Sequence, residues 1–376
     1  MRRLYRERLV AELRRAKFGT LVRRAAKWAA IRTAPMSRKT LAGPILGTLV
    51  TNYGCNLRCR MCDLPARPAR YRAEGLRPLD TPELLGVIDD FAALGTVGLG
   101  FTGGEPMLRK DLFDLLERSI LRGMITHLNT NGSFVDAAAA ERLVALGLDS
   151  VNLSLDAADP AKHDSIRGHV GSHAEVLVAA RRILEARRRA KAETPRLKLV
   201  TVLAPDTIDE AERVADLRSD IGADGVDFIP LHDFDPPGSD RERPLPTRLD
   251  AETRERIDTV VNRLRARART EPIENSDRHL ALIPGALEGR PSPVRCFAGW
   301  NSLVVDLYGR IFPCVPYSDH DRPVGNLSTT PLREFWWSRS YEAERRELSR
   351  CRACTLNCQT ELNLLFDRGR AGRRTS

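Results

Sequence analysis

Short runs of apolar and β-branched residues alternate with longer amphipathic stretches along the first two thirds of the chain. The runs predict buried strands, and the 3.6-residue spacing of apolar positions between them predicts helices. The predicted strands are 44–52, 97–101, 124–128, 150–155, 196–203 and 226–231. The predicted helices are 111–122, 137–146, 173–191 and 209–221. This alternation gives six strand–helix units and indicates an α/β fold with a parallel sheet wrapped by helices.

The pattern changes after the sixth strand. Residues 232–246 are rich in turn formers and charge, which predicts a linker or a substrate-facing loop. An amphipathic helix is predicted over 251–267, where apolar residues recur on one face at Ile257, Val260, Val261 and Leu264. Beyond it, apolar residues 303–307, a Tyr-Gly turn and a second apolar pair predict a β-hairpin. The length of 376 residues suits one large and one small domain, and no apolar run is long enough to span a bilayer.

Positive charge is concentrated at one end of the chain. The 60 Lys and Arg against 50 Asp and Glu give a net charge of +10, but residues 1–40 alone hold thirteen basic and two acidic residues, a net +11. The remainder is nearly neutral and has no basic surface interleaved with aromatic residues, so no nucleic-acid partner is expected. In residues 1–40 apolar side chains recur at loosely helical spacing, which predicts a helix in peripheral contact with anionic membrane lipid. These side chains are Leu13, Leu21, Ala25 and Trp28. A basic helix that packs on the fold explains the pattern equally well.

Eight cysteines without a signal peptide are typical of a reducing, cytoplasmic compartment. Three of them, Cys55, Cys59 and Cys62, lie in one loop directly after the first predicted strand. Zinc sites usually have four protein ligands, and neither a His nor a fourth Cys lies near this loop. A disulfide would leave one thiol over. Three thiolates can hold an iron–sulfur cube with one iron left open, while zinc and redox-active thiols remain the alternatives.

The C-x3-C-x2-C spacing of this loop resembles the signature of the radical S-adenosylmethionine (SAM) superfamily. The resemblance implies a partial (β/α)6 TIM-like barrel with its site at the carboxyl ends of the strands. It also implies a [4Fe–4S] cluster held by the three cysteines, whose open iron binds SAM and whose reduction releases a 5′-deoxyadenosyl radical. The chain departs from the family at Met61, where an aromatic residue near the adenine is more usual. Met is an apolar and adaptable substitute.

The same resemblance assigns SAM contacts to residues at the ends of later strands. A Gly-Gly-Glu turn after the second strand matches the family turn whose glycines let the backbone approach SAM. Motifs after the third and fourth strands match others that line the SAM site, and one arginine matches a residue that pairs with the SAM carboxylate. Taken singly, these are also common turn and cap sequences, and the arginine fits a solvated helix start. The residues so assigned are Gly103, Gly104, Glu105, Asn131, Ser154, Asp156 and Arg167.

The other five cysteines lie in the last third of the chain. Their layout, with a hairpin between the first two and a C-x2-C pair later, resembles the SPASM and twitch auxiliary-cluster domains. A full SPASM domain has seven cysteines for two clusters, so five favour one auxiliary [4Fe–4S] cluster. We expect Cys358 to be a spare or substitute ligand and the cluster to be held by Cys296, Cys314, Cys351 and Cys354. A four-thiolate zinc site fits the same spacing.

These features divide the chain into a basic leader, a barrel, a linker with helices and a small α+β auxiliary-cluster domain, with bounds 1–43, 44–235, 236–290 and 291–376. The expected function is hydrogen abstraction by an oxidoreductase or maturase acting on a peptide, with a flavodoxin- or ferredoxin-type electron donor. The alternatives are a radical dehydrogenase or carbon–carbon bond-forming enzyme acting on a small molecule or lipid at the membrane, and an iron–sulfur electron carrier. No catalytic acid or base can be assigned, because turns and strand edges also account for Asp306, Tyr308, Asp319 and His320.

Overall fold

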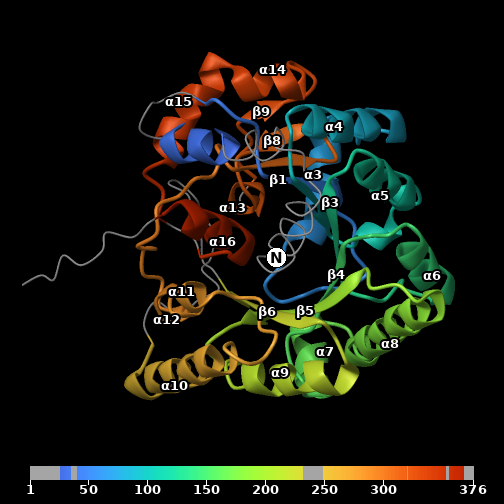
Figure 1. Ribbon diagram of the computed structural model, residues 1–376, viewed down its shortest axis with the longest axis vertical. Coiled ribbons are helices and arrows are strands. Elements are labelled where there is room, and N and C mark those ends of the chain that lie inside the picture. The colour runs from blue at the N-terminus through green and yellow to red at the C-terminus, as the bar shows by residue number, and fades with distance from the viewer. Residues whose placement is uncertain (1–25, 35–39, 232–248, 320, 353–354, 368–376) are drawn as a thin grey trace, which may run out of the picture.

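The computed structural model describes residues 26–34, 40–231, 249–319, 321–352 and 355–367. Its centre is one nine-stranded sheet in the order β6-β5-β4-β3-β2-β1-β7-β8-β9 (Figure 1). The first seven strands in this order run parallel, and β8 and β9 are antiparallel additions. The strands are β1 (Leu46–Asn52), β2 (Gly98–Gly103), β3 (Ile125–Thr130), β4 (Ser150–Ser154), β5 (Arg196–Leu203), β6 (Gly225–Pro230), β7 (Ser302–Asp306), β8 (Arg310–Phe312) and β9 (Gly325–Asn326).

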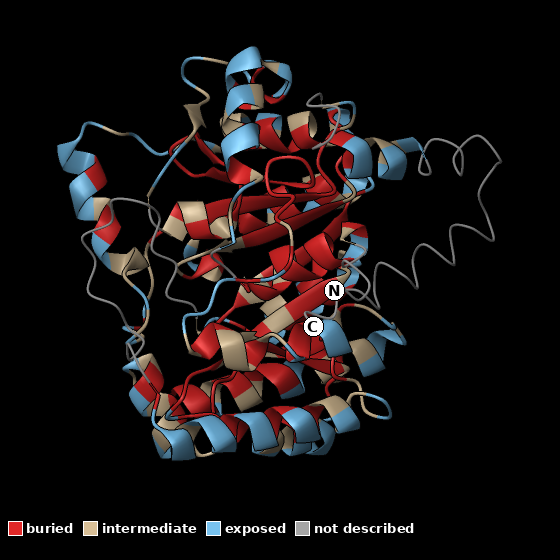
Figure 2. Ribbon diagram, turned by 90° about the vertical axis from the view of Figure 1, so that its left-hand side faces the viewer, coloured by how far each residue is buried: buried red, intermediate tan, exposed pale blue. Residues whose placement is uncertain are grey.

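Helices cover the outer face of the parallel strands. Leu99 and Phe101 of β2 pack outward in the large core with Phe91, so Gly98 and Gly100 lie on the opposite, inner face. Figure 2 shows the result: buried strands and inner helix faces, with exposed outer helix faces. The outer helices are α4 (Thr81–Ala93), α5 (Leu112–Leu121), α6 (Ala137–Ala145), α8 (Ser172–Ala190), α9 (Glu210–Ile221) and α10 (Ala251–Arg267). Short helices follow β1, β2 and β4: η1 (Leu64–Ala66), α3 (Arg67–Ala73), η2 (Pro106–Leu108) and α7 (Pro160–Arg167).

Aspartates begin several of these helices. The Asp80 side chain accepts a hydrogen bond from Glu83 N at 2.9 Å, and Glu83 accepts one from Asp80 N at 2.8 Å, which completes a capping box at α4. Similar side-chain caps begin α6, α7 and α10 at Asp136, Asp159 and Asp250. Each cap is worth about 1 kcal/mol, because it satisfies a backbone N–H that the helix leaves unpaired.

The C-terminal hairpin extends the barrel sheet. β7 pairs in parallel with β1, with Leu46 opposite Ser302 and Val50 opposite Asp306. The hairpin therefore lies directly beside the strand that leads into the first cysteine loop. The remaining helices are α11 (Asp277–Leu280), α12 (Ile283–Leu287), α13 (Val315–Asp319), α14 (Leu332–Trp337), α15 (Arg339–Leu348) and α16 (Asn357–Phe366).

The α/β class and the partial barrel are confirmed. The six barrel strands and the five helices predicted from the sequence are present within two residues of their predicted bounds, and the hairpin is present as well. The helix α4, the loop helices and the helices after residue 277 were not predicted. The pairing of β7 with β1 was not predicted either.

Residues 26–34 form a helical segment that packs on the fold. Ile31 is buried with Leu46, and the ring of Trp28 lies 4.6 Å from that of Phe366. Lys27 Nζ donates to the Pro44 carbonyl at 2.9 Å. Residues 26–34 are therefore a basic helix that packs on the fold, which was one of the two explanations for the charge pattern. Leu13, Leu21 and Ala25 lie outside the described residues. In the part of the chain that the structure describes, no helix is both long and apolar enough to cross a membrane.

Candidate active site

The three cysteines of the first loop line one cavity at the carboxyl edge of the barrel. Cys55, Cys59 and Cys62 share this cavity of about 210 Å³ with residues from the ends of β2, β3, β4 and β5. A backbone hydrogen bond from Arg58 N to Arg167 O, at 3.1 Å, holds the loop against the last turn of α7. The loop therefore presents its three thiols to one space from a fixed backbone.

Gly103 and Gly104 are required by the close approach of the cysteine loop. A Cβ atom at Gly104 would lie 2.3 Å from the Gly54 carbonyl oxygen, and one at Gly103 would lie 2.1 Å from the Asn52 carbonyl oxygen. Gly104 N also donates to Asn52 O at 2.7 Å. A side chain at either position would push β2 away from the loop, so these glycines shape the cavity as well as lining it.

Glu105 is fully buried and holds the end of β3. Its carboxylate accepts hydrogen bonds from the Thr130 hydroxyl at 2.7 Å, from Asn131 N at 2.8 Å and from Met107 N at 2.9 Å. Burial raises the pKa of Glu105, and these hydrogen bonds oppose the shift. Glu105 is not part of the cavity wall, so the structure gives it an orienting position next to the expected SAM site.

Asn131 and Ser154 do line the cavity. Asn131 Nδ2 donates to Asn56 Oδ1 at 2.8 Å and lies 3.8 Å from Cys55 Sγ, so it contacts the cysteine loop directly. Other residues at strand ends line the same space and were not selected from the sequence. Three of them, Thr102, Asn129 and Val202, face inward by alternation along their strands, which is a signal that could have identified them. The fourth is Thr130, the last residue of β3.

Arg167 faces the cavity, and Asp156 supports it from behind. Arg167 Nη1 lies 3.8 Å from Cys59 Sγ, and Arg167 Nε lies 2.8 Å from Asp156 Oδ2. Asp156 is fully buried outside the cavity wall, and its other oxygen accepts from Val202 N at 2.9 Å. Burial lowers the pKa of Arg167, but the charges of Asp156 and Cys59 outweigh it and raise the pKa. A permanent cation therefore lies beside the thiols.

The residues that line the cavity suit an iron–sulfur cluster with SAM bound to it. Burial raises the pKa of Cys55, and it raises that of Cys62 to about 11, so these thiols need a bound cation to become thiolates. Within the described ranges, no three His, Cys, Asp or Glu side chains surround the position of a single metal ion. Three thiols spread around a cavity, beside a guanidinium and a glycine turn, suit a larger multi-iron group.

The structure brings three of the five later cysteines together. Cys296 and Cys314 are buried side by side, and Cys351 packs against them. Cys358 packs in a different apolar cluster, with residues of β1 and of the segment 26–34. Cys354 lies outside the described residues. The described part of the expected auxiliary site is therefore the group Cys296, Cys314 and Cys351.

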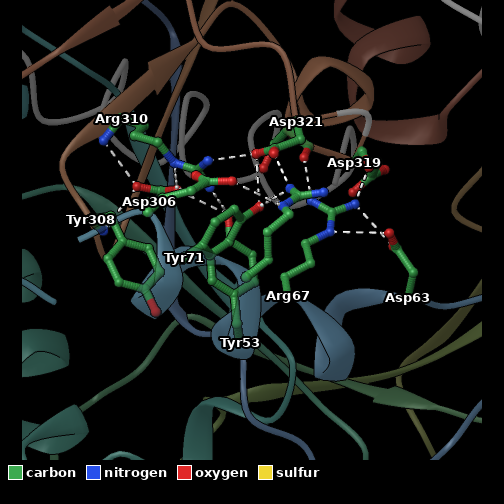
Figure 3. A network of polar contacts seen from close by, with 12 residues as sticks. Tyr53, Asp63, Arg67, Tyr71, Asp306, Tyr308, Arg310, Asp319 and Asp321 are labelled. Atoms are coloured by element: carbon green, nitrogen blue, oxygen red, sulfur yellow. Dashed lines mark hydrogen bonds and ion pairs between the residues drawn. The ribbon is translucent and has the colours of Figure 1, made fainter. Parts of the chain in front are cut away.

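A buried polar network joins the first cysteine loop to the hairpin (Figure 3). The Tyr53 hydroxyl donates to Asp306 Oδ2 at 3.0 Å, and Arg310 Nε donates to the same carboxylate at 2.7 Å. Arg310 also donates to Asp321 at 2.5 Å, and its guanidinium lies 4.0 Å from the centre of the Tyr71 ring. Burial and the charge of Asp306 raise the pKa of Tyr53, so its hydroxyl remains a donor. Asp306 is thus fully engaged in structural contacts.

A second connection lies on the other side of the loop. Arg67 of α3 donates to Asp63 Oδ1 at 2.9 Å and to the Ser318 carbonyl at 2.6 Å, and it also bonds the Asp319 carbonyl (Figure 3). Asp63 follows Cys62, and Ser318 follows Cys314 by four residues. Hydrogen bonds therefore connect the two cysteine-bearing segments at both ends of the first cysteine loop.

Three thiols around one cavity at the carboxyl edge of a partial α/β barrel define an iron–sulfur barrel protein. Residues 49–218 match the radical SAM superfamily, and residues 296–359 match the SPASM iron–sulfur cluster-binding domain. The chain is 32% identical over 315 residues to the PqqA peptide cyclase of Streptomyces rochei, covering 81% of this chain and 80% of that protein. It is 28% identical over 326 residues to the PqqA peptide cyclase of Ruegeria pomeroyi, covering 84% and 80%. The chain belongs to the radical SAM superfamily and carries its SPASM domain.

Solved structures share the fold. SuiB of Streptococcus suis, bound to SAM, superposes with a TM-score of 0.59 at 16% identity, over 86% of this chain and 71% of that one. The anSMEcpe protein with bound SAM and the Cp18Cys peptide superposes with a TM-score of 0.58 at 19% identity, over 86% and 96%. At these identities the likeness concerns the arrangement of the elements, and it agrees with the partial barrel.

Family membership settles the cofactors. The chain is a radical SAM enzyme that uses SAM, a [4Fe–4S] cluster and auxiliary iron–sulfur, as expected from its cysteine loops. When bound, these groups supply the reductive cleavage of SAM to a 5′-deoxyadenosyl radical that takes a hydrogen atom from the substrate. The alternative of a simple electron carrier does not apply.

Proposed function

We propose that Cys55, Cys59 and Cys62 hold the [4Fe–4S] cluster and that the rest of their cavity holds SAM. The observation that carries this proposal is that all three thiols line one cavity with the glycine turn and the ends of β3 and β4. The residues proposed to contact SAM are Gly103, Gly104, Asn131, Ser154 and Arg167. Glu105 and Asp156 do not contact SAM in this proposal. Each is buried outside the cavity wall and orients residues of the wall, Glu105 through hydrogen bonds and Asp156 through its ion pair with Arg167.

Arg167 has two tasks in this proposal. Its guanidinium can pair with the SAM carboxylate in a bidentate geometry, for which a planar fork suits better than an ammonium. Its position 3.8 Å from Cys59 Sγ also offsets the negative charge of the thiolates. Asp156, at 2.8 Å, fixes the direction of the guanidinium.

The later cysteines hold one auxiliary [4Fe–4S] cluster. Its ligands are Cys354 together with the group Cys296, Cys314 and Cys351, which the fold gathers in one place. Cys358 is the spare thiol, since it packs in another cluster. The division into parts at 1–43, 44–235, 236–290 and 291–376 belongs to this proposal, with the SPASM match at residues 296–359 in its support.

The substrate is a peptide, and the reaction is an oxidation or maturation of that peptide. Support comes from the similarity to PqqA peptide cyclases over most of the chain. It also comes from the shared fold of SuiB bound to its precursor peptide SuiA and of anSMEcpe with bound peptide. Each SAM cleavage consumes an electron, so a flavodoxin- or ferredoxin-type donor is the second partner.

Residues 1–40 provide a peripheral contact with anionic membrane lipid. Their net charge of +11 supports this proposal. Trp28 remains 39% exposed although it packs on Phe366, so part of its ring is available to a lipid surface. Liposome flotation with and without these residues tests the contact.

Anaerobic reconstitution tests the core of the proposal. Roughly eight irons per chain are expected for two four-iron clusters. Replacing Cys55, Cys59 and Cys62 together by Ala should remove about half of the iron and all cleavage of SAM to 5′-deoxyadenosine. Cys351→Ala is the matched control, because it should lower the iron content and leave the first site able to cleave SAM. Retained SAM cleavage in the triple variant would overturn the assignment.

A further inference from the structure

Three buried oxygen atoms near β6 have no hydrogen-bond partner within the described residues. They are Asp227 Oδ1, Asn357 Oδ1 and Glu361 Oε2, on side chains that are only 4–5% exposed. The amide oxygen and the oxygens of ionised carboxylates accept hydrogen bonds and donate none. A buried acceptor without a donor is unfavourable, and a buried carboxylate without one is more so. The three atoms therefore indicate that a donor-rich group binds here.

The helix α16 carries two of these acceptors to the side of β6. Asn357 and Glu361 are four residues apart and so share a face of the helix. Glu361 Oε1 accepts from Ser276 N at 2.6 Å. The neighbouring Asn275 side chain bonds both the N–H and the carbonyl of Phe228 in β6, each at 2.8 Å. Glu361 therefore lies next to the segment 275–276, which borders β6.

Asp227 lies on the inner face of the barrel sheet. Its neighbours Val226 and Phe228 pack in the outer core, so alternation places the Asp227 side chain on the inner face. Cys358 follows Asn357 by one residue. Burial raises the pKa of the Cys358 thiol to about 12, and the negative charge of Asp227 contributes to this increase. The third acceptor is therefore within electrostatic range of the first turn of α16, which carries Asn357.

Two cations on the inner face, Arg196 and Lys198, lie near a third carboxylate, Glu274. Arg196 Nη2 lies 3.0 Å from Glu274, and Lys198 acts on the same carboxylate. Burial raises the pKa of Glu274, and the charges of nearby cations, Lys198 and Arg196 among them, lower it overall. Among the described residues, no ion pair within 4.0 Å joins Arg196 or Lys198 to Asp227 or Glu361. Arg196 therefore pairs with Glu274, and among the described residues neither Asp227 nor Glu361 forms an ion pair.

The position of Asp227 relative to the SAM cavity suits a side chain of a bound peptide. Val202 lines that cavity and lies opposite Ile229 in the β5–β6 register, and Asp227 is two residues further into the barrel. Two residues of a strand correspond to about 7 Å. This depth is comparable to the length of an extended lysine or arginine side chain.

We propose that Asp227, Asn357 and Glu361 form a subsite for a cationic side chain of the peptide substrate, a primary ammonium or a guanidinium. An ammonium offers three donors and a guanidinium five, enough to satisfy the three acceptors at once. The proposal rests on the proposed peptide substrate and names the side chain that the barrel would recognise.

Binding of short peptides to the anaerobic holoenzyme with SAM and without reductant tests the subsite. The probes are acetyl-Gly-X-Gly-amides in which X is Lys, Arg, norleucine, Gln or Glu, measured by calorimetry. The Lys or Arg peptide should bind at least about tenfold more tightly than the norleucine peptide, because charged hydrogen bonds replace apolar contact. Asp227→Asn and Glu361→Gln should each reduce this preference at least about threefold. The matched control Asp258→Asn, on the exposed face of α10, should leave it unchanged.

A second measurement separates ligand binding from water filling and from misfolding. Without peptide, Asp227→Asn should melt at or above the temperature of the wild type, since it removes a buried charge that has no donor. A lower melting temperature together with equal binding of all five peptides would show that water alone satisfies these oxygens and would overturn the subsite. The same preparations are assayed for SAM cleavage with dithionite. Cleavage without peptide preference rejects the subsite only, whereas absence of cleavage in the wild type rejects the proposed function.

Discussion

Tyr53 and Asp306 are joined by a buried hydrogen bond of 3.0 Å that links the two cysteine-bearing parts of the chain. Tyr53 precedes Cys55 by two residues, and Asp306 ends the strand that pairs with β1. Arg310 donates to the same carboxylate. Asp306 therefore accepts one hydrogen bond from Tyr53, in the part with the first cysteine loop, and one from Arg310, in the hairpin. The relative position of the two cysteine sites is therefore set by directional polar contacts in addition to the pairing of β1 with β7.

Replacement of Arg310 should destabilise the protein strongly. Arg310→Met leaves Asp306 buried without its cation, which is expected to cost about 3 kcal/mol or more in the free energy of unfolding. Tyr53→Phe removes one hydrogen bond and should cost about 1 kcal/mol. Chemical denaturation of the apoprotein measures both. Arg333→Met is the control, because Arg333 is 63% exposed in its pair with Asp90 and should cost less than about 1 kcal/mol. Equal losses for Arg310 and Arg333 would contradict the network's role.

Removal of the Asp156 carboxylate should weaken SAM binding without loss of iron. Asp156→Asn keeps the shape of the side chain but releases Arg167, and loss of such an orienting partner typically costs about tenfold in affinity. Calorimetry with the reconstituted, unreduced enzyme measures the dissociation constant of SAM. Asp206→Asn is the control, since Asp206 forms an exposed pair with Arg60. If Asp156 acts through Arg167, the double variant with Arg167→Lys should bind SAM no more weakly than Arg167→Lys alone.

Much of the barrel could be predicted because its signals are local. The strand before Cys55, the cysteine spacing and the Gly-Gly-Glu turn each lie within a few neighbouring residues. The helix α4 had a readable signal as well, since Leu84, Ile88 and Phe91 recur at helical spacing after the Asp80 cap. The pairing of β1 with β7 joins residues some 250 positions apart and leaves no local trace, so the sequence could not show that the hairpin continues the barrel sheet.

The direction of each polar side chain is the other feature that the sequence does not contain. Glu105 and Asp156 have the right chemistry for a SAM contact, and both follow strands that end at the cavity. The fold buries both and turns their oxygens to Thr130, Val202 and Arg167. The residue type is therefore enough to locate the region of the site. Burial and strand register determine which side chains face the ligand.

The two sets of cysteines should respond differently to single substitutions. Cys358→Ala is expected to retain the full iron content of the reconstituted enzyme, because Cys358 packs outside the group of Cys296, Cys314 and Cys351. Cys351→Ala should lose roughly half of the iron, as expected for one of two four-iron clusters. Iron and sulfide analysis after gel filtration measures both. Loss of iron from Cys358→Ala equal to that from Cys351→Ala would make Cys358 a ligand.

The pH dependence of stability should contain a contribution from His163. Burial, Arg167 and His173 lower the pKa of His163 to about 3, and its Nδ1 accepts from Asp156 N at 3.1 Å, which requires the neutral ring. The unfolded chain, with a histidine pKa of about 6.5, takes up this proton first, so the free energy of unfolding falls as pH drops from about 6.5 toward 3. The slope for one proton is about 1.4 kcal/mol per pH unit.

His163→Asn should remove this slope while keeping an acceptor near Asp156 N. Urea denaturation of the apoprotein at several pH values between 7 and 4.5 measures the difference. His169→Asn is the matched control, because it makes the same substitution at a histidine whose side chain is 41% exposed. Parallel pH profiles for wild type and His163→Asn would show that His163 takes up its proton in the folded protein.

A last prediction concerns the glycine turn, where shape can be separated from chemistry. Gly104→Ala would place its methyl group 2.3 Å from the Gly54 carbonyl oxygen, so β2 or the cysteine loop must move. Because the loop carries all three thiols, the variant should lose most of the iron of the first cluster and destabilise the apoprotein by about 2 kcal/mol. Iron analysis and chemical denaturation measure these effects.

Gly86→Ala is the matched control for that substitution. Gly86 lies inside α4, and a Cβ atom there meets no atom within 4 Å. Alanine has the higher helix propensity, so this variant should gain about 0.5–1 kcal/mol of stability and keep its iron. If Gly104→Ala also keeps its iron and its SAM affinity, the loop tolerates displacement, and the close approach of β2 to Gly54 is not what fixes the three thiols around their cavity.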